Sequence, residues 1–296
     1  MNIGIVGAGA IGMLFGAYLS EAKHNVTFLV RDLNQLEQLY IEKSDAPRQL
    51  INCELVGNMS KLYKMDLIIV AVKYHHLHSI KKELDLMPPN IPLLFIQNGL
   101  LHLDFINNLK QSTIILGSVL HGATKKNPNT VQHLGVGITT IGLYKGEWSR
   151  LDEFLCSKKE EFPFKLVTDI EPVLFKKAMI NCLINPLTTI AKVQNGDLIK
   201  NHAYNTILKN MYEEITGAFE DWKELLSWEE IVTICKNTEY NRSSMLKDYE
   251  NSRKMELDTI VGAVIESAAK RNKELPILNT FYLLLNEINK VGGDNH

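Results

Sequence analysis

The sequence is poor in cysteine, and its four cysteines stand far apart. Cys53, Cys156, Cys182 and Cys235 include no C-x-x-C pair. Disulfide frameworks and structural zinc sites are built from cysteines at characteristic close spacings. The spacing therefore argues against both kinds of site, and it indicates buried thiols in a protein of a reducing compartment.

The sequence also lacks an excess of charge of either sign. It has 32 lysines and arginines against 34 aspartates and glutamates, which gives a formal net charge of -2. A chain so close to neutral has no general attraction for nucleic acid or for an anionic membrane, so neither partner is expected. Any basic residue that matters must act locally.

Long hydrophobic runs are missing as well. No stretch reaches about 18 uninterrupted apolar residues, so no membrane span is expected. The segment from Ile3 to Leu19 is mostly apolar, but it has no basic leading segment and is interrupted by glycines, unlike a signal peptide. These features predict a cytoplasmic protein.

In place of long runs, the first half of the chain has short apolar runs separated by helical segments, one of which extends to about Ala22. Such runs are typical of strands that are buried on both faces of a parallel sheet. The predicted strands are residues 2–7, 25–30, 67–72, 92–96 and 113–120. The segment 130–142 is rich in Thr, Val, Ile and Gly, and predicts an antiparallel addition near the sheet edge.

The pattern becomes helical near Asp169. Apolar residues then recur every three or four positions, at Leu208, Met211, Ile215, Phe219, Trp222 and Leu226. The run Ser227-Trp228-Glu229-Glu230 has the spacing of a capping box at a helix start, and residues 255–270 and 278–288 also favour helices. Since 296 residues exceed the usual single core, two domains are expected.

The predicted fold is α/β, with an N-terminal Rossmann-type dinucleotide-binding domain over residues 1–169. An all-helical substrate-binding domain follows over residues 170–296. No low-complexity linker separates them, so we expect a hinge and a shared cleft at the boundary.

The run Gly7-Ala8-Gly9-Ala10-Ile11-Gly12 has G-x-G-x-x-G spacing and lies between a predicted strand and a predicted helix. Gly7 permits the tight turn, Gly9 lets the backbone approach a pyrophosphate, and Gly12 lets helix and strand pack closely. The helix N-terminus offers N–H groups to the phosphates. The motif therefore predicts a bound dinucleotide.

The residue at the end of the second predicted strand indicates which dinucleotide. NAD enzymes usually have an acidic residue there, whereas NADP enzymes use arginine for the 2′-phosphate. This chain has Arg31 followed by Asp32, which predicts NADPH/NADP+ as the cofactor. Two alternatives stay open: Asp32 binds a ribose diol and allows some NAD use, or the two residues form a surface ion pair.

Further motifs make the sequence resemble the ketopantoate reductase (2-dehydropantoate 2-reductase) family. They follow the family's order from residue 1 to about residue 262, and the K-x-x-x-N-x-x-x-N-P-L-T and N-x-S-S-M blocks are the most specific. The matching segments are Val72-Lys73, Gln97-Asn98-Gly99, Phe175 to Thr188, Asn195 to Leu198, Asn241 to Leu246 and Glu256-Leu257-Asp258. The resemblance implies an oxidoreductase, a monomer or homodimer, that reduces 2-dehydropantoate to pantoate with NADPH in pantothenate (vitamin B5) and coenzyme A biosynthesis.

The resemblance also assigns roles position by position. As catalytic residues it implies Lys177 and Glu256. As cofactor contacts it implies Gly7, Ala8, Gly9, Ala10, Ile11, Gly12, Arg31, Lys73, Asn98, Ala123 and Glu256. As substrate ligands it implies Lys177, Asn181, Asn185, Asn195, Asn241 and Ser244.

The chemistry of these residues agrees with the implied roles. Lys177, Asn181 and Asn185 follow one another at four-residue intervals, so one helical face carries all three. A hydride that reaches a ketone carbon leaves negative charge on oxygen, which a lysine can stabilise and protonate. The neighbouring Lys176 is expected to face solvent. The alternatives are a solvated Lys177 and asparagines that make structural hydrogen bonds.

Glu256 is expected to hold Lys177 protonated or to bind the nicotinamide ribose. Ser244 lies near the start of a predicted helix and is expected to bind the substrate carboxylate, unless it only caps that helix. Arg242 stays open as an alternative carboxylate partner. Lys73 and Asn98 end predicted strands, where ligands bind in open α/β sheets.

Five histidines raise the question of a metal, and the adjacent pair among them cannot face one ion from a regular helix. We expect no metal, and polar histidines near the cleft entrance: His75, His76, His78, His102 and His121.

Departures from the family pattern keep other functions open. Phe175 stands where the family often has tryptophan, Val261-Gly262 stands where it commonly has asparagine before the glycine, and the tail 275–279 matches only loosely. The alternatives are a paralogue that reduces another small 2-oxo acid and a non-catalytic NADPH sensor. A 6-phosphogluconate-type dehydrogenase would need a larger helical domain.

Overall fold

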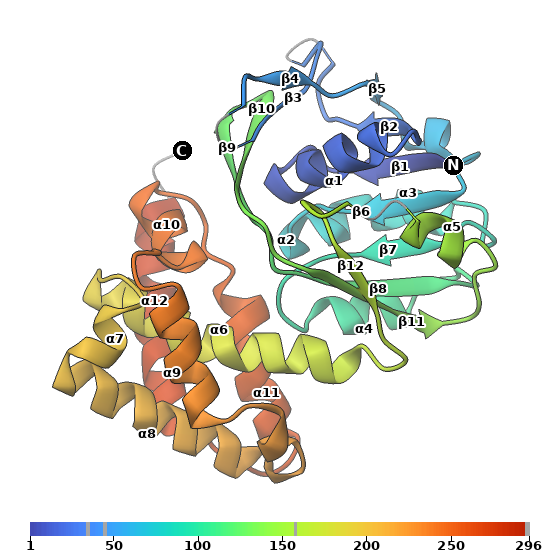
Figure 1. Ribbon diagram of the computed structural model, residues 1–296. Coiled ribbons are helices and arrows are strands. Elements are labelled where there is room, and N and C mark those ends of the chain that lie inside the picture. Colours follow the sequence, from blue (N-terminus) through green and yellow to red (C-terminus); the bar gives the residue numbers. More distant parts are fainter. Residues whose placement is uncertain (34–35, 44–45, 157–158, 294–296) are drawn as a thin grey trace. The chain divides into compact units, whose positions relative to one another are not determined.

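The computed structural model describes residues 1–33, 36–43, 46–156 and 159–293 (Figure 1). The chain divides into two units. Met1–Gln97 and Asp104–Ile170 form the first, and the second consists of Asn98–Leu103 and the chain from Glu171 onward. The short segment Asn98–Leu103 thus belongs to the helical unit although it lies within the N-terminal part of the sequence.

The first unit is built on a mostly parallel sheet. Its strands, in spatial order, are β12 (Phe164–Leu166), β11 (Thr139–Lys145), β8 (Ile114–Val119), β7 (Leu93–Phe95), β6 (Leu67–Val70), β1 (Asn2–Val6), β2 (Asn25–Leu29) and β5 (Cys53–Val56). Only the pair β8/β11 is antiparallel among them. Strands such as β6 and β7 are buried along their whole length, as their uninterrupted apolar sequences predict.

The order of the strands creates a switch point at β1. The chain adds β2 and β5 on one side of β1, then returns to add β6, β7 and β8 on the other side. Ligands of open α/β sheets bind beyond the carboxyl ends of the strands at such a point. The glycine turn follows β1 directly and therefore lies there.

A second sheet was not predicted. It contains β4 (Gln49–Leu50), β3 (Tyr40–Glu42), β10 (Thr130–Gly135) and β9 (Gly122–Asn127), in this order. The prediction of one edge addition over 130–142 was therefore partly wrong: β11 does join β8, but β10 pairs with β3 in the second sheet. That partner is remote in sequence, and local alternation cannot identify it.

Helix α1 (Ala10–Glu21) packs against β1 and β2 of the large sheet and against β3, β9 and β10 of the small one (Figure 1). The remaining helices between strands are short: η1 (Met59–Leu62), α2 (Tyr74–Leu77), η2 (His78–Ile80), α3 (Lys81–Asp85), α4 (His102–Asn107) and α5 (Leu151–Leu155). The core of this unit includes the buried aromatic side chains of Phe15, Tyr18 and Phe162.

The second unit is helical. Its helices are α6 (Glu171–Ala191), α7 (Asp197–Lys200), α8 (His202–Ala218), η3 (Glu220–Leu225), α9 (Trp228–Asn237), α10 (Ser244–Glu250), the π-helical turn η4 (Asp258–Gly262), α11 (Ala263–Ala269) and α12 (Pro276–Gly293). Helix α6 packs against α8, α10, α11 and α12. In the described part of the chain, no helix combines the length and the apolar character needed to cross a membrane.

Two details of the helical prediction were tested. Ser227 accepts a hydrogen bond from the Glu230 backbone N–H at 3.1 Å, which confirms the start of α9. The helical pattern that the sequence shows through Leu226 is divided between two elements, because α8 ends at Ala218 and a 3-10 helix follows. The three- to four-residue spacing persists beyond that end since Phe219 and Trp222 both pack against Phe175.

The cysteines are all free thiols. Cys182 and Cys235 are buried as expected, but Cys53 is only partly buried and Cys156 is exposed. Cys156 lies at the C-terminal end of the short helix α5, directly after its last residue. The prediction of four buried thiols was therefore half right.

Candidate functional site

The glycine turn between β1 and α1 has the backbone geometry that its sequence predicts. Gly7 has φ +109°, and a Cβ there would lie 2.8 Å from Val72 Cγ1. A Cβ at Gly12 would overlap the carbonyl oxygen of Gly7. Both glycines are therefore required by the protein itself: one for the turn and one for the close packing of α1.

Gly9 has a different reason to be glycine. Its φ of -76° suits any residue, and within the described residues no atom lies within 4 Å of the Cβ that a side chain would add. The protein fold therefore does not require glycine at this position. Gly9 lines a pocket, so the missing side chain leaves room for a ligand beside the turn, which fits a dinucleotide pyrophosphate.

The pocket has a volume of about 850 Å³, within the range of roughly 300–1,000 Å³ typical of small-molecule sites. It lies at the switch point, and its polar and turn residues include Gly7, Ala8, Gly9, Arg31, Asp32, Lys73, His76, Glu83 and Lys125. Burial lowers the pKa of His76, and the charges of Arg31 and Lys73 lower it further. This corner of the pocket therefore favours an anionic group.

Five of the predicted cofactor contacts line this pocket, namely Gly7, Ala8, Gly9, Arg31 and Lys73. Ala10, Ile11 and Gly12 form the first turn of α1, and Ala123 is a partly buried residue of β9. Asn98 and Glu256 belong to the other unit. Lys125 also lines the pocket, and the sequence analysis did not identify it.

Lys177 lies in α6 in a chain of polar side chains within the helical unit. Its Nζ donates to Asn98 Oδ1 at 2.8 Å, and Asn98 Nδ2 donates to Glu256 Oε2 at 3.2 Å. Asn98 therefore bridges the predicted acid and its predicted acidic partner. Lys176, by contrast, forms an ion pair with Glu230 at 2.7 Å and is one-third exposed.

The segment that carries Asn98 is held against the π-helical turn η4. The Leu100 backbone N–H donates to the Thr259 carbonyl at 3.1 Å. Gly99 has φ +78°, and a Cβ there would overlap the same carbonyl oxygen. Only glycine allows this approach without strain, so the backbone of Gly99 sets the position of the neighbouring Asn98.

The surroundings of Lys177 bring its pKa closer to neutrality. Burial lowers its pKa to about 8, although the charge of Glu256 acts in the opposite direction. His102, which is 1% exposed, has its pKa lowered to about 4 by burial and by Lys177. The histidine is therefore neutral at pH 7, while a lysine with a pKa near the working pH both binds and releases a proton readily.

Two of the predicted substrate ligands carry buried amide atoms with no hydrogen-bond partner among the described residues. These atoms are Asn185 Nδ2 and Asn195 Oδ1. An unsatisfied buried amide costs free energy unless a ligand or water completes it. Asn181 lies one turn before Asn185 on α6 and is partly buried, so this helical face is as predicted.

The two later motifs come together in the fold. The Asn195 backbone N–H donates to the Asn241 carbonyl at 3.0 Å. Ser244 is the exposed first residue of α10, and the capping serine is its neighbour Ser243, which accepts from the Leu246 N–H. The alternative in which Ser244 caps the helix was therefore wrong. Arg242 pairs with Glu250.

The histidines do not share one location. The rings of His75 and His76 lie 4.0 Å apart, and His78 packs edge-on against Phe105. His102 and His121, which were expected as polar histidines near the cleft entrance, are buried. In the described ranges, no group of three or more His, Cys, Asp or Glu residues is arranged to hold a metal ion.

Comparison with known proteins adds independent observations. The family model described as ketopantoate reductase PanE/ApbA matches residues 3–146, and the model of its C-terminal part matches residues 169–289. The 2-dehydropantoate 2-reductase of Listeria innocua is 33% identical over 291 residues, 96% of each chain. The enzyme of that name from Bacillus subtilis is 31% identical over 289 residues, 95% of each chain.

A solved structure is similar over the same extent. The crystal structure of probable 2-dehydropantoate 2-reductase PanE from Bacillus subtilis covers 97% of this chain with 100% of its own. The two share 28% sequence identity and superpose with a TM-score of 0.86.

Proposed function

The chain belongs to the ketopantoate reductase family, and we propose that it reduces 2-dehydropantoate to pantoate with NADPH, a step of pantothenate and coenzyme A biosynthesis. The observation that supports this most directly is the polar chain Lys177–Asn98–Glu256. It holds the ammonium of Lys177 in the helical unit that also contains Asn185 and Asn195, two asparagines with unsatisfied buried amide atoms.

When bound, NADPH would supply the hydride that reduces the ketone carbon. In this proposal the glycine turn and Lys73 bind its phosphates, and Arg31 binds the 2′-phosphate. The shape of the pocket supports these roles, because the open space at Gly9 lies beside the turn and Arg31 and Lys73 line the same pocket.

Lys177 is the proposed proton donor to the ketone oxygen. The amide of Asn98 orients its Nζ, since the amide oxygen accepts from lysine while the amide nitrogen donates to Glu256. The carboxylate of Glu256 keeps the lysine protonated, because its charge raises the pKa that burial lowers. A lysine in this state stabilises the developing oxyanion and then protonates it.

The substrate ligands are also proposals. Asn181, Asn185 and Asn195 supply carboxamides, and the unsatisfied atoms of the latter two support this role. Asn241, in the loop before α10, and Ser244, the exposed first residue of α10, are proposed to bind the polar groups of the substrate. Both roles follow from membership of the family and the position of the motif.

A turnover assay tests the proposed function. We expect NADPH oxidation with 2-dehydropantoate to exceed that with 2-oxoisovalerate or oxaloacetate at equal concentration. A higher kcat/KM for one of the other acids would identify a paralogue with a different substrate. Cofactor binding without turnover of any of them would favour a sensor.

Replacing Arg31 with alanine tests the cofactor preference. The variant loses a charge-assisted contact to the 2′-phosphate, so we expect its dissociation constant for NADPH to rise roughly 10- to 100-fold. The constant for NADH, which has no 2′-phosphate, is expected to change little. Titration calorimetry with both cofactors measures the two effects, and an equal loss for both would show that Arg31 does not bind this phosphate.

Three coarser features complete the proposal. We place the domain boundary between residues 169 and 170, supported by the division of the units after Ile170. The four free thiols support a cytoplasmic location. We propose a monomer or homodimer, which light scattering in solution distinguishes.

A further inference from the structure

Lys125 lies in the small sheet, yet it lines the pocket with Arg31 and Lys73. Its Nζ donates to the carbonyl oxygen of Ala8, the second residue of the glycine turn, at 3.1 Å. The carbonyl oxygen of Ala8 thus accepts a hydrogen bond from one of the three N–H groups of the ammonium. The positive charge of Lys125 is thereby held beside the turn, in the pocket that Gly9 also lines.

Lys125 differs from Lys43 in that no acidic side chain among the described residues pairs with its charge. Burial lowers its pKa, and among the described residues no carboxylate offsets that effect. Lys43, which burial also affects, has its pKa raised by hydrogen bonds to Glu161 and Glu21. A partly buried cation without an acidic partner is costly, and an anionic ligand removes that cost.

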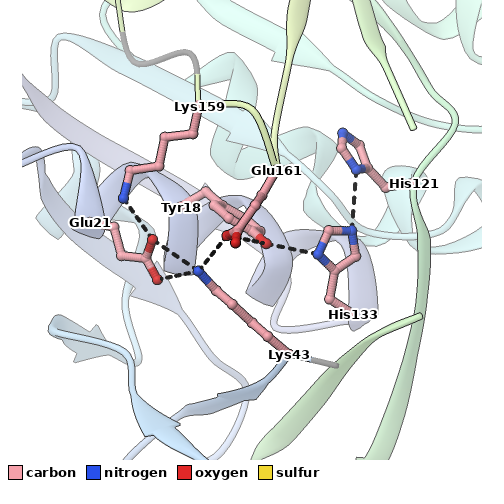
Figure 2. A network of polar contacts seen from close by, with 7 residues as sticks. All are labelled: Tyr18, Glu21, Lys43, His121, His133, Lys159 and Glu161. Carbon is pink, nitrogen blue, oxygen red and sulfur yellow. Dashed lines mark hydrogen bonds and ion pairs between the residues drawn. The ribbon is translucent and has the colours of Figure 1, made fainter. Parts of the chain in front are cut away.

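The strand that carries Lys125 is tied to the helix that follows the glycine turn. In β9, Ala123 pairs with His133 of β10. Tyr18 of α1 contacts His133 through its hydroxyl, 2.8 Å from Nδ1 (Figure 2). Since His133 Nε2 lies 3.0 Å from the carbonyl of Gly135, which can only accept, the neutral ring donates from Nε2 and accepts from tyrosine at Nδ1.

Charged residues surround this connection. Lys43 lies between Glu21 of α1 and Glu161 (Figure 2), and its Nζ is 2.9 Å from a carboxylate oxygen of each. Lys159 pairs with Glu21 at 2.7 Å. The small sheet is thus joined to α1 by a buried hydrogen bond and by ion pairs. These contacts hold the small sheet against α1, and the hydrogen bond to the Ala8 carbonyl holds Lys125 at the turn itself.

We propose that Lys125 binds the pyrophosphate of the nicotinamide dinucleotide, as a third cationic contact besides Arg31 and Lys73. The inference rests on the proposed function only in requiring a dinucleotide in this pocket. Ala8 lies in the turn whose N–H groups receive the pyrophosphate, whereas Arg31 follows β2 at the 2′-phosphate position. Lys125 therefore contacts the part that NADPH and NADH share.

Two variants of Lys125 and one matched control test the proposal. Lys125→Met keeps the length of the stem and removes the charge, and Lys125→Gln retains an N–H donor should the methionine variant fold poorly. Lys126→Met is the control, because Lys126 is the next residue of β9, is 59% exposed and pairs with Glu42. Calorimetric dissociation constants for NADPH and NADH are the readout, with thermal melting as the check of folding.

We expect both Lys125 variants to raise the constants for NADPH and NADH by a similar factor, roughly 10- to 100-fold, as the loss of a charge-assisted hydrogen bond predicts. Lys126→Met leaves both constants unchanged. Unchanged binding in folded Lys125 variants, or a loss confined to NADPH, overturns the assignment. A wild-type chain that binds both cofactors without reducing 2-dehydropantoate refutes the proposed reaction alone, and one that binds neither refutes both.

Discussion

Lys177→Ala is expected to lower kcat by about 10²–10⁴-fold, the usual scale for losing a general acid. Lys177 Nζ donates a hydrogen bond to Asn98 Oδ1 at 2.8 Å. Its pKa of about 8 means that the lysine is mostly protonated at neutral pH and yet releases its proton readily. NADPH binding is expected to survive, because Gly7 to Gly9, Arg31 and Lys73 line a pocket of the other unit. Steady-state kinetics and cofactor titration of the same preparation measure the two quantities.

Two further variants separate the chemistry from the charge. Lys177→Arg keeps the charge but scarcely releases a proton at neutral pH, so arginine is not expected to restore turnover. Lys176→Ala removes the neighbouring lysine, which pairs with Glu230, and is expected to retain turnover. If Lys176→Ala loses turnover and Lys177→Ala keeps it, the assignment belongs one residue earlier. If both keep it, Glu256 or bound water is the next candidate donor.

The pH dependence of kcat provides a second readout of the same assignment. Lys177 donates its proton only when protonated, and that fraction falls as the pH rises through about 8. The reduction rate is therefore expected to be constant below this pH and to fall above it, by about tenfold per pH unit. Glu256→Gln removes the charge that raises this pKa, so the descending limb is expected to move to lower pH.

The central strands and the glycine turn could be predicted because their causes are local. A strand buried on both faces, such as Leu67–Val70, must be apolar throughout. A turn that places a helix N-terminus beside β1 must have glycine at 7 and 12. Patterns of this kind can be recognised within a short stretch of the sequence that contains them.

The small sheet depends on partners that no local window contains. β10 pairs with β3 across about ninety residues of sequence, Thr130 with Tyr40, and neither strand is long or strongly alternating. The role of Lys125 was missed for the same reason, because its contact with Ala8 joins residues 117 positions apart. In the sequence, only Ala123, two residues earlier on the strand, indicated that this face of β9 contacts the cofactor, and that indication came from the family resemblance.

In the helical unit, too, local sequence patterns predicted only part of the site around Lys177. The face of Lys177, Asn181 and Asn185 follows from helical periodicity, and α6 contains all three. The bridging position of Asn98 does not follow from it, because residues 98–103 belong to a unit whose other residues begin at Glu171. The burial of His102 was missed for a related reason, since nothing around it in sequence indicates that Lys177 lies near.

Gly99→Ala is expected to lower kcat by about 100-fold without touching a residue that has a proposed chemical role, since a displacement of about 1 Å at a catalytic group costs this much. A Cβ at Gly99 would overlap the Thr259 carbonyl oxygen, and φ +78° is itself unfavourable for alanine. The segment must therefore move away from η4. Asn98 moves with it, and its hydrogen bonds to Lys177 and Glu256 are lost or lengthened.

The matched control for Gly99→Ala is Gly217→Ala. Gly217 is an exposed residue of α8, and among the described residues nothing lies within 4 Å of the added Cβ. Alanine there is expected to stabilise the protein by about 0.4–1 kcal/mol and to leave kcat unchanged. Thermal melting and kcat are measured for both variants. A Gly99→Ala protein that melts like wild type and keeps its kcat would mean that the Gly99–Thr259 contact does not position Asn98, since the backbone would have adjusted without moving the amide that orients Lys177.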